Sequence, residues 1–223
     1  MTAIISSTIF LVVVGAFIPV AAWMSKKALD QGLRVERLDF YLETVVIQTV
    51  LVALSLWVSR SNELAITFRP AGGVQMIIGA AGLTVIALLA LGVGWRASSV
   101  ERRDRLRMIV PFSREEKFAW VGVSIAAGVA EELIYRAVLF GLILTWTGEV
   151  WIAALVAGVS FALAHLVQGW IAVLIVFVYG LLFQVLYVTS GSLFAPVLVH
   201  VIYDLLAGLL ISRWSRRDDE QTL

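Results

Sequence analysis

The chain has 223 residues, of which 61% are hydrophobic and only 15% are charged, and its formal net charge is +1. An average soluble domain is charged at about 25% of its residues, so this composition excludes an ordinary soluble fold and indicates an integral membrane protein in a lipid bilayer. No stretch rich in lysine or arginine alternates with aromatic residues, and we expect no nucleic-acid partner. The sequence contains no cysteine, which excludes disulfides and thiolate metal sites.

The predicted elements are long apolar helices. Runs of about 18 or more apolar residues are candidate membrane spans, and the sequence contains seven: 4–24, 41–58, 76–95, 117–146, 149–168, 170–189 and 192–212. The first run has no basic residue before it, unlike a cleaved signal peptide, so we expect a retained helix. We predict an all-α, polytopic membrane protein with about seven transmembrane helices, within a range of six to eight.

The chain is predicted to form a single integral membrane domain over residues 1–223. Residues 1–112 hold the first three helices and their loops, 113–212 hold the helices with most intramembrane polar residues, and 213–223 form a tail. The composition of "SRRDDEQTL" at the C-terminus is typical of a disordered segment.

The fourth apolar run is too long for one upright helix across ~30 Å of hydrocarbon. The sequence "SREE" before it matches a capping box, with Ser113 as N-cap and Glu116 at the third helical position. We therefore expect a long helix that begins in the cytoplasmic interface and tilts through the membrane.

The distribution of lysine and arginine predicts the orientation. The first loop contains four of these residues, the third loop seven and the C-terminal tail three, whereas the opposite side contains two. Cytoplasmic loops carry the excess of positive charge. With seven spans, the C-terminus is cytoplasmic, and we expect the plasma (inner) membrane.

Polar residues inside the predicted spans are few, and a charge there costs several kcal/mol unless it is paired or hydrated. We interpret Glu43, near the end of its span, as an ordinary interface residue. Six others lie deeper and include both histidines of the chain: Glu131, Glu132, Arg136, His165, His200 and Asp204. Such residues almost always face the bundle interior, so we predict a polar cavity among the C-terminal helices.

The stretch "AEELIYR" divides its two glutamates between two helix faces. Glu132 and Arg136 are four residues apart and share a face. An ion pair that only locks helix packing is an equally good interpretation of these two. Glu131 is rotated about the helix axis by about 100° from Glu132, and its neighbour on that face is Tyr135. Because it has no oppositely charged partner on its own helix, Glu131 needs a partner from another helix or from water.

Two further helices contribute imidazoles. Phe161 and His165 share a face of the fifth span, and His200 and Asp204 share a face of the seventh. A single histidine on an apolar helix, such as His165, is more often a hydrogen-bonded core residue than a catalytic one. A His–carboxylate pair such as His200 and Asp204 can form half of a metal site, or the carboxylate can simply orient the imidazole. Together with Glu131, these residues can converge on one cavity.

Such a cavity has the groups needed for amide hydrolysis by an activated water. A buried glutamate can take a proton from water, and the imidazoles can position that water or stabilise an oxyanion. A covalent acyl-enzyme is disfavoured because no serine lies in a GxSxG setting and no cysteine is present.

The motifs "EELIYR", "FALAH" and "HVIYD" match the patterns EExxxR, FxxxH and HxxxD/N in order on successive helices. The chain thereby resembles the CPBP family of intramembrane proteases, also called the type II CAAX prenyl endopeptidase or Abi family, over roughly residues 115–208. The resemblance implies an endopeptidase acting on a membrane-associated protein or peptide, either prenylated and CAAX-type or similar to a leader peptide or bacteriocin.

The resemblance also implies roles for the polar residues. Glu131 activates water beside His165, and His200 and Asp204 stabilise the oxyanion or bind water. Glu132 and Arg136 support the site. The last position is often asparagine in the family, and an ionised aspartate cannot donate to an oxyanion, so Asp204 must be protonated, orient His200 or bind a cation.

The family implies either no required cofactor or Zn²⁺. The ligand candidates for a metal are Glu131, His165, His200 and Asp204, whose donor types suit zinc. Sequence reasoning leaves both alternatives open.

Two other functions remain open at this point. Buried Glu, His and Asp also form proton relays in ion-coupled transporters, although the sequence shows no inverted repeat. A non-proteolytic immunity or scaffold protein with the same fold is the second alternative.

Overall fold

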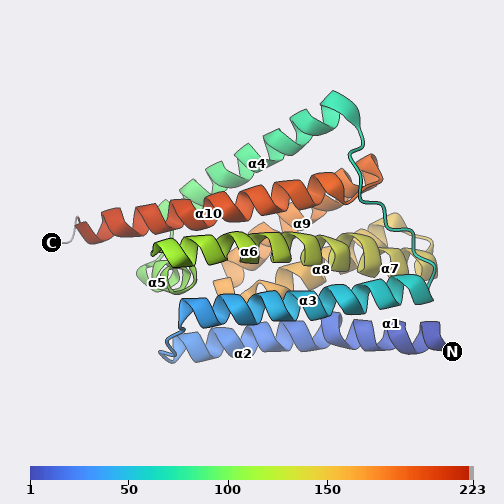
Figure 1. Ribbon diagram of the computed structural model, residues 1–223, viewed down its shortest axis with the longest axis horizontal. Helices are drawn as coiled ribbons and strands as arrows, with labels where there is room; N and C mark the ends of the chain where they lie inside the picture. Colours follow the sequence, from blue (N-terminus) through green and yellow to red (C-terminus); the bar gives the residue numbers. More distant parts are fainter. Residues whose placement is uncertain (221–223) are drawn as a thin grey trace.

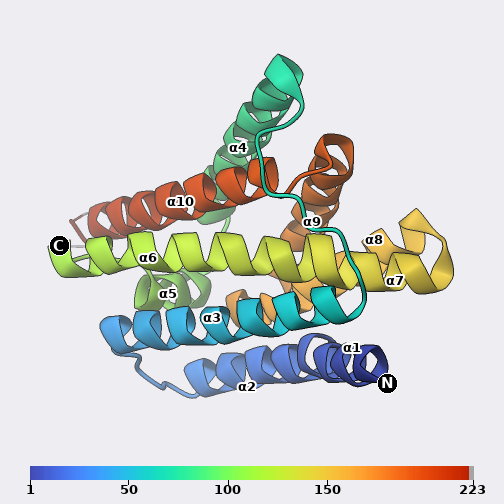
Figure 2. The same cartoon turned by 45° about the vertical axis from the view of Figure 1, so that its right-hand side comes forward.

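The computed structural model describes residues 1–220, and over this range the protein is all-helical, with 85% helix. Figures 1 and 2 show a bundle of long helices in which α6 runs through the middle, between α3 and α10. The N-terminus and α7 lie at one end of the bundle, and α5 and the C-terminus lie at the other, which we call the α5 end (Figure 1).

The N-terminal part consists of three helical rods. The first is continuous from Thr2 to Asp30, but a π-helical turn interrupts it just before Pro19, which has no backbone N–H to donate. The elements are α1 (Thr2–Val12), η1 (Val13–Phe17), α2 (Ile18–Asp30), α3 (Arg37–Ser61) and α4 (Gly73–Arg96).

The C-terminal part contains four more rods and a short helix, α5. The predicted long fourth helix is a continuous rod made of α6, η2 and α7. The elements are α5 (Val100–Ile109), α6 (Arg114–Glu131), η2 (Glu132–Leu139), α7 (Phe140–Thr147), α8 (Val150–Ala164), η3 (Leu166–Gln168), α9 (Trp170–Ser190) and α10 (Phe194–Glu220).

These helices confirm the predicted all-α polytopic class. Each of the seven predicted runs falls on one helical rod. Within residues 1–220, five helices are long and apolar enough to cross a membrane: Thr2–Asp30, Arg37–Ser61, Gly73–Arg96, Trp170–Ser190 and Phe194–Asp218. Val150–Ala164 is a shorter apolar helix, and the α6–η2–α7 rod contains the glutamate doublet.

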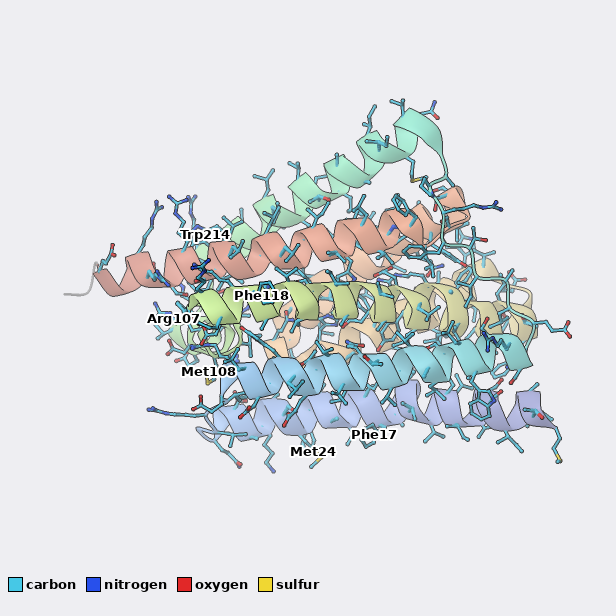
Figure 3. The ribbon with its side chains drawn as sticks, in the orientation of Figure 1. Phe17, Met24, Arg107, Met108, Phe118 and Trp214 are labelled. Carbon is cyan, nitrogen blue, oxygen red and sulfur yellow. The ribbon has the colours of Figure 1, made fainter. Side chains whose placement is uncertain are left out.

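The outer surface of the bundle is apolar, as a lipid-facing surface must be. Figure 3 shows Phe17 and Met24 on the outer side of the first rod, where their side chains are 67% and 59% exposed. Phe118 on α6 is 83% exposed. The protein is therefore an integral membrane protein, and the glutamate doublet lies toward the inside of the bundle, with Glu132 fully buried.

The fourth rod begins as the sequence predicts. The Ser113 side chain accepts a hydrogen bond from the Glu116 backbone N–H at 3.0 Å, and the Glu116 carboxylate accepts from the Ser113 N–H at 2.9 Å. Both halves of the capping box are formed. Arg37 Nη1 lies 3.4 Å from Glu116 Oε1, which fixes this helix start beside the start of α3.

Two predicted boundaries differ in the structure. The fifth helix ends at Ala164 rather than 168, because His165 leaves helical geometry and a 3₁₀ turn leads to Gly169 at φ +95°. The predicted disordered tail is helical as far as Glu220. Arg103 Nη1 lies 3.0 Å from Asp218 Oδ2, so contacts with α5 stabilise that extension. Residues 221–223 of the predicted tail lie outside the described range.

Three basic segments meet at the α5 end. Arg105 of α5 lies 2.6 Å from Asp30 at the end of the first rod. Arg107 donates to the carbonyl of Ser215 in α10 at 2.8 Å. The first loop, the third loop and the C-terminal segment thus lie at one end of the bundle, as the charge distribution predicts.

A glycine allows α6 and α10 to approach closely. A Cβ atom on Gly128 would lie 2.6 Å from Cγ2 of Val201 and 3.3 Å from its backbone N. Such distances leave no room for a side chain. The next turn of α6 therefore brings the glutamate doublet directly against His200 of α10.

Candidate active site

The glutamate doublet lies where the fourth rod changes from α- to π-helix. Glu131 is the last residue of α6 and Glu132 the first of η2. All eight residues of η2 are buried, and π-helical turns frequently occur at functional sites. The Glu131 side chain keeps 17% of its surface exposed whereas that of Glu132 keeps 0%, so the two carboxylates have different surroundings.

Glu132 forms the predicted ion pair with Arg136. Arg136 Nε lies 3.0 Å from Glu132 Oε2, and the Arg136 side chain is 1% exposed. The guanidinium carbon also lies 4.3 Å from the centre of the Phe161 ring, which adds a cation–π contact. This buried pair is neutral as a unit and holds η2 against α8.

His200, itself a predicted site residue, joins this ion pair through a contact that the sequence does not predict. Its Nδ1 lies 2.8 Å from Glu132 Oε1. Because a carboxylate accepts hydrogen bonds, Nδ1 carries the proton and the opposite nitrogen, Nε2, points away from Glu132. Nε2 then lies 3.7 Å from Glu131 Oε2 and 3.5 Å from Asp204 Oδ2.

Glu131 has one anchored oxygen and one open oxygen. Oε1 accepts a hydrogen bond from Nε2 of Gln48 in α3 at 3.0 Å. Oε2 is buried and has no hydrogen-bond partner within residues 1–220. It lies 3.8 Å from Nε2 of His165 and 3.7 Å from Nε2 of His200. The two imidazoles thus present the same ring nitrogen to one carboxylate oxygen.

His165 is oriented by the last turn of α8. It is the C-cap residue, and its Nδ1 lies 2.9 Å from the carbonyl oxygen of Phe161. A carbonyl only accepts, so Nδ1 carries the proton and Nε2 is free to accept a hydrogen bond. The Phe161 ring packs against His165 with ring centres 4.6 Å apart. This contact fixes the plane of the imidazole.

The structure brings together the predicted residues from three segments of the chain. The atoms of Glu131, His165, His200 and Asp204 that face each other are 3.5 to 3.8 Å apart. Tyr135, the predicted neighbour of Glu131, packs edge-on against Phe161 with ring centres 5.1 Å apart. The convergence of the four polar residues on one point is a property of the fold.

Gln48 is the site residue that sequence reasoning missed. It lies in the second span among Thr44, Thr49 and Ser55, and nothing in its local sequence distinguishes it from these neutral polar residues. Only the packing of α3 against α6 brings its amide to Glu131. A neutral amide in a span is the sole signal that could have pointed to it.

Glu131, His165, His200 and Asp204 are the candidate ligands for a metal ion. Two imidazoles and two carboxylates suit Zn²⁺ by donor type. Within residues 1–220, however, no group of three or more His, Asp or Glu side chains is arranged to hold a metal ion.

Residues 114–206 match the family model described as type II CAAX prenyl endopeptidase Rce1-like. The matched segment begins at the first residue of α6 and includes Glu131, His165, His200 and Asp204, so the resemblance seen in the three motifs is confirmed. No match was found among curated proteins or among solved structures. The match supports a CAAX-type intramembrane protease that acts on a membrane-associated protein.

Proposed function

We propose that the protein is an intramembrane endopeptidase in which Glu131 activates the water that attacks a peptide bond. Its substrate is a membrane-associated protein or peptide, of a prenylated CAAX type or similar to a leader peptide. The observation that carries this proposal is the position of Glu131 Oε2, 3.7 and 3.8 Å from Nε2 of His200 and His165.

A water molecule fits the spacing around this oxygen. Distances of 3.7 and 3.8 Å are too long for direct hydrogen bonds, and polar groups at this spacing are often bridged by water. The water donates one proton to Glu131 Oε2 and the other to His165 Nε2, which accepts because Nδ1 donates to Phe161. A lone pair of the water is then left to attack the carbonyl carbon.

His200 is the proposed donor to the oxyanion. Its Nδ1–H already points to Glu132, so donation from Nε2 requires a proton on both ring nitrogens. Asp204, 3.5 Å from Nε2, compensates the charge of that imidazolium. Of the three roles that the sequence left open for Asp204, this geometry favours the orientation of His200.

The proton taken by Glu131 completes the reaction. As water attacks, its oxygen bonds to the carbonyl carbon, and Glu131 becomes a carboxylic acid. When the tetrahedral intermediate collapses, the C–N bond breaks and Glu131 returns the proton to the leaving amine. A carboxylic acid and an amine are released, which ionise in solution, and Glu131 is again ionised.

Gln48 and the Glu132–Arg136 pair position these groups. The hydrogen bond to Oε1 leaves Oε2 as the oxygen that faces the histidines. The buried pair orients His200 through Nδ1. No metal is needed in this scheme; a bound Zn²⁺ would polarise the carbonyl and acidify the water.

The orientation is part of the proposal. The α5 end, where the basic segments meet, faces the cytoplasm according to the positive-inside rule, and the membrane is the plasma (inner) membrane. Substrate reaches Glu131 from that side.

The proposal is tested by reconstitution of the purified protein in liposomes. A farnesylated CAAX peptide, its unprenylated counterpart and a library of membrane-anchored peptides are incubated with wild type and with His165→Ala, and products are identified by mass spectrometry. We expect a defined internal cleavage by wild type that His165→Ala loses. Cleavage of equal rate in both proteins would contradict the proposed site.

A further inference from the structure

A cavity of about 140 Å³ lies beside the proposed active site, between α4, α5, α9 and α10. Two of its wall residues connect it to the catalytic groups. Asp204 lies 3.5 Å from His200 Nε2, and Gln168 follows His165 by one 3₁₀ turn. The cavity is therefore adjacent to the position proposed for the scissile bond.

Most of the cavity wall is apolar, and its volume is small. The apolar lining comes from four helices and includes Ala87, Leu91, Ile175, Val176, Ala207 and Ile211. Its volume is close to the ~150 Å³ of an apolar cavity that binds one benzene molecule. The space suits one apolar side chain of intermediate size.

Arg102 is the one basic residue among the described residues that line this cavity. Two neighbouring arginines of α5 have acidic partners: Arg103 lies 3.0 Å from Asp218 and Arg105 lies 2.6 Å from Asp30. Arg102, by contrast, has no acidic side chain within ion-pair distance in residues 1–220, and its Nε, like that of Arg105, is buried without a hydrogen-bond partner there. Burial of the side chain also lowers the pKa of Arg102, so an anion bound beside it would be stabilising.

We propose that this cavity binds the C-terminal residue of the substrate, with Arg102 pairing with its free α-carboxylate and the apolar wall holding its side chain. A guanidinium recognises a carboxylate through two parallel hydrogen bonds. This inference rests on the proposed peptidase function, because the cavity receives the segment that follows the cleaved bond.

The extent of the cavity agrees with a bond close to the chain end. Asp204, Ala207, Gly208 and Ile211 line it from one face of α10, and seven residues of helix span about 10 Å. Three residues of extended peptide cover a similar distance, at roughly 3.3–3.6 Å each. The carboxylate can thus lie a few residues beyond the scissile bond while the cavity holds only the last side chain, and Arg102 selects substrates that end there.

The test is a binding measurement on the full-length protein in detergent micelles. The probes are acetyl-Val-Leu-Ala with a free carboxylate and the same peptide as its C-terminal amide. Because the amide lacks the charge that strengthens the hydrogen bonds to Arg102, we expect wild type to bind the acid at least about tenfold more tightly than the amide. Arg102→Gln should bind the two peptides equally.

Two further variants act as controls. Arg213→Gln removes the same charge from an exposed site on α10 and should keep the preference for the acid. Arg102→Lys keeps the charge without the bidentate geometry and should keep part of that preference. If Arg102→Gln does not fold, a reduced preference for the acid in Arg102→Lys supports the subsite, and an unchanged preference contradicts it. Equal binding of acid and amide by wild type, or an unchanged preference in Arg102→Gln, would overturn the proposed subsite.

A cleavage assay separates this inference from the proposed function. If wild type cleaves peptides but treats acid and amide substrates alike, the Arg102 subsite is wrong and the peptidase stands. If wild type cleaves nothing while binding still depends on Arg102 and the carboxylate, the peptidase proposal fails and the carboxylate site stands.

Discussion

Nε2 of Gln48 donates to Oε1 of Glu131 at 3.0 Å, across 83 residues of sequence. This bond joins α3, which lies outside the segment matched by the family model, to the proposed catalytic base. It occupies one carboxylate oxygen and leaves the other facing the histidines. The N-terminal helices therefore take part in the geometry of the site as well as in the bundle.

Replacement of Gln48 tests this role. Gln48→Leu removes the donor, so Glu131 loses its fixed orientation, and we expect kcat to fall about tenfold or more, the equivalent of a charged hydrogen bond. KM should change little, because Gln48 is proposed to position the base. Thr49→Val, an exposed neighbour on the same helix, is the control. An unchanged kcat in Gln48→Leu would show that the bond has no catalytic role.

The buried ion pair predicts a contrast between the two adjacent glutamates. Glu132→Gln leaves Arg136, which is 1% exposed, without its anionic partner, and breaking a buried pair costs about 3–5 kcal/mol. Glu131→Gln removes a carboxylate that has no ion pair with a lysine or arginine within residues 1–220. We expect thermal unfolding in detergent at a clearly lower temperature for Glu132→Gln than for Glu131→Gln. Equal melting temperatures would contradict the structural role assigned to Glu132.

The close approach at Gly128 gives a prediction about helix packing. In Gly128→Ala the new Cβ would lie 2.6 Å from Cγ2 of Val201, so α6 and α10 must separate, at a cost of about 1–3 kcal/mol. Because this shift also separates Glu132 from His200, activity should fall together with stability. Gly122→Ala on the same helix meets no atom within 4 Å and should be tolerated. If both variants behave alike, packing at this point does not position the site.

The proposed chemistry also predicts the effect of chelators. Glu131 and the histidines supply the base and the oxyanion donor, so peptidase activity in liposomes should persist after treatment with 1,10-phenanthroline or EDTA. The control is a zinc peptidase treated in the same liposomes, which must lose its activity. Loss of cleavage by this protein, with recovery on addition of Zn²⁺, would replace the metal-independent scheme with a zinc-dependent one.

The parts of the site that the sequence predicted are those governed by local helix geometry. Residue spacing alone predicts the Glu132–Arg136 pair and places Glu131 on a different face of the helix. The high free-energy cost of a charge in lipid predicts that the polar side chains point into the bundle. These arguments also placed His165 and His200 near one another.

The contacts that sequence reasoning missed are set by packing between helices. The bond from His200 to Glu132 depends on the space left by Gly128, and the bond from Gln48 depends on how α3 packs against α6. The sequence predicts too short a final helix because one stabilising partner of Asp218 is Arg103, more than 100 residues earlier. Residue spacing within one helix contains no information about such partners.

The cleavage rate of Glu131→Gln tests the central claim most directly. Wild type, Glu131→Gln and the exposed control Glu115→Gln on the same helix are compared in liposomes, on a peptide that wild type cleaves. Loss of a general base lowers a rate by about 10²–10⁴-fold, so Glu131→Gln should lose at least about a hundredfold while Glu115→Gln keeps the wild-type rate. A folded Glu131→Gln protein that cleaves at the wild-type rate would contradict the account.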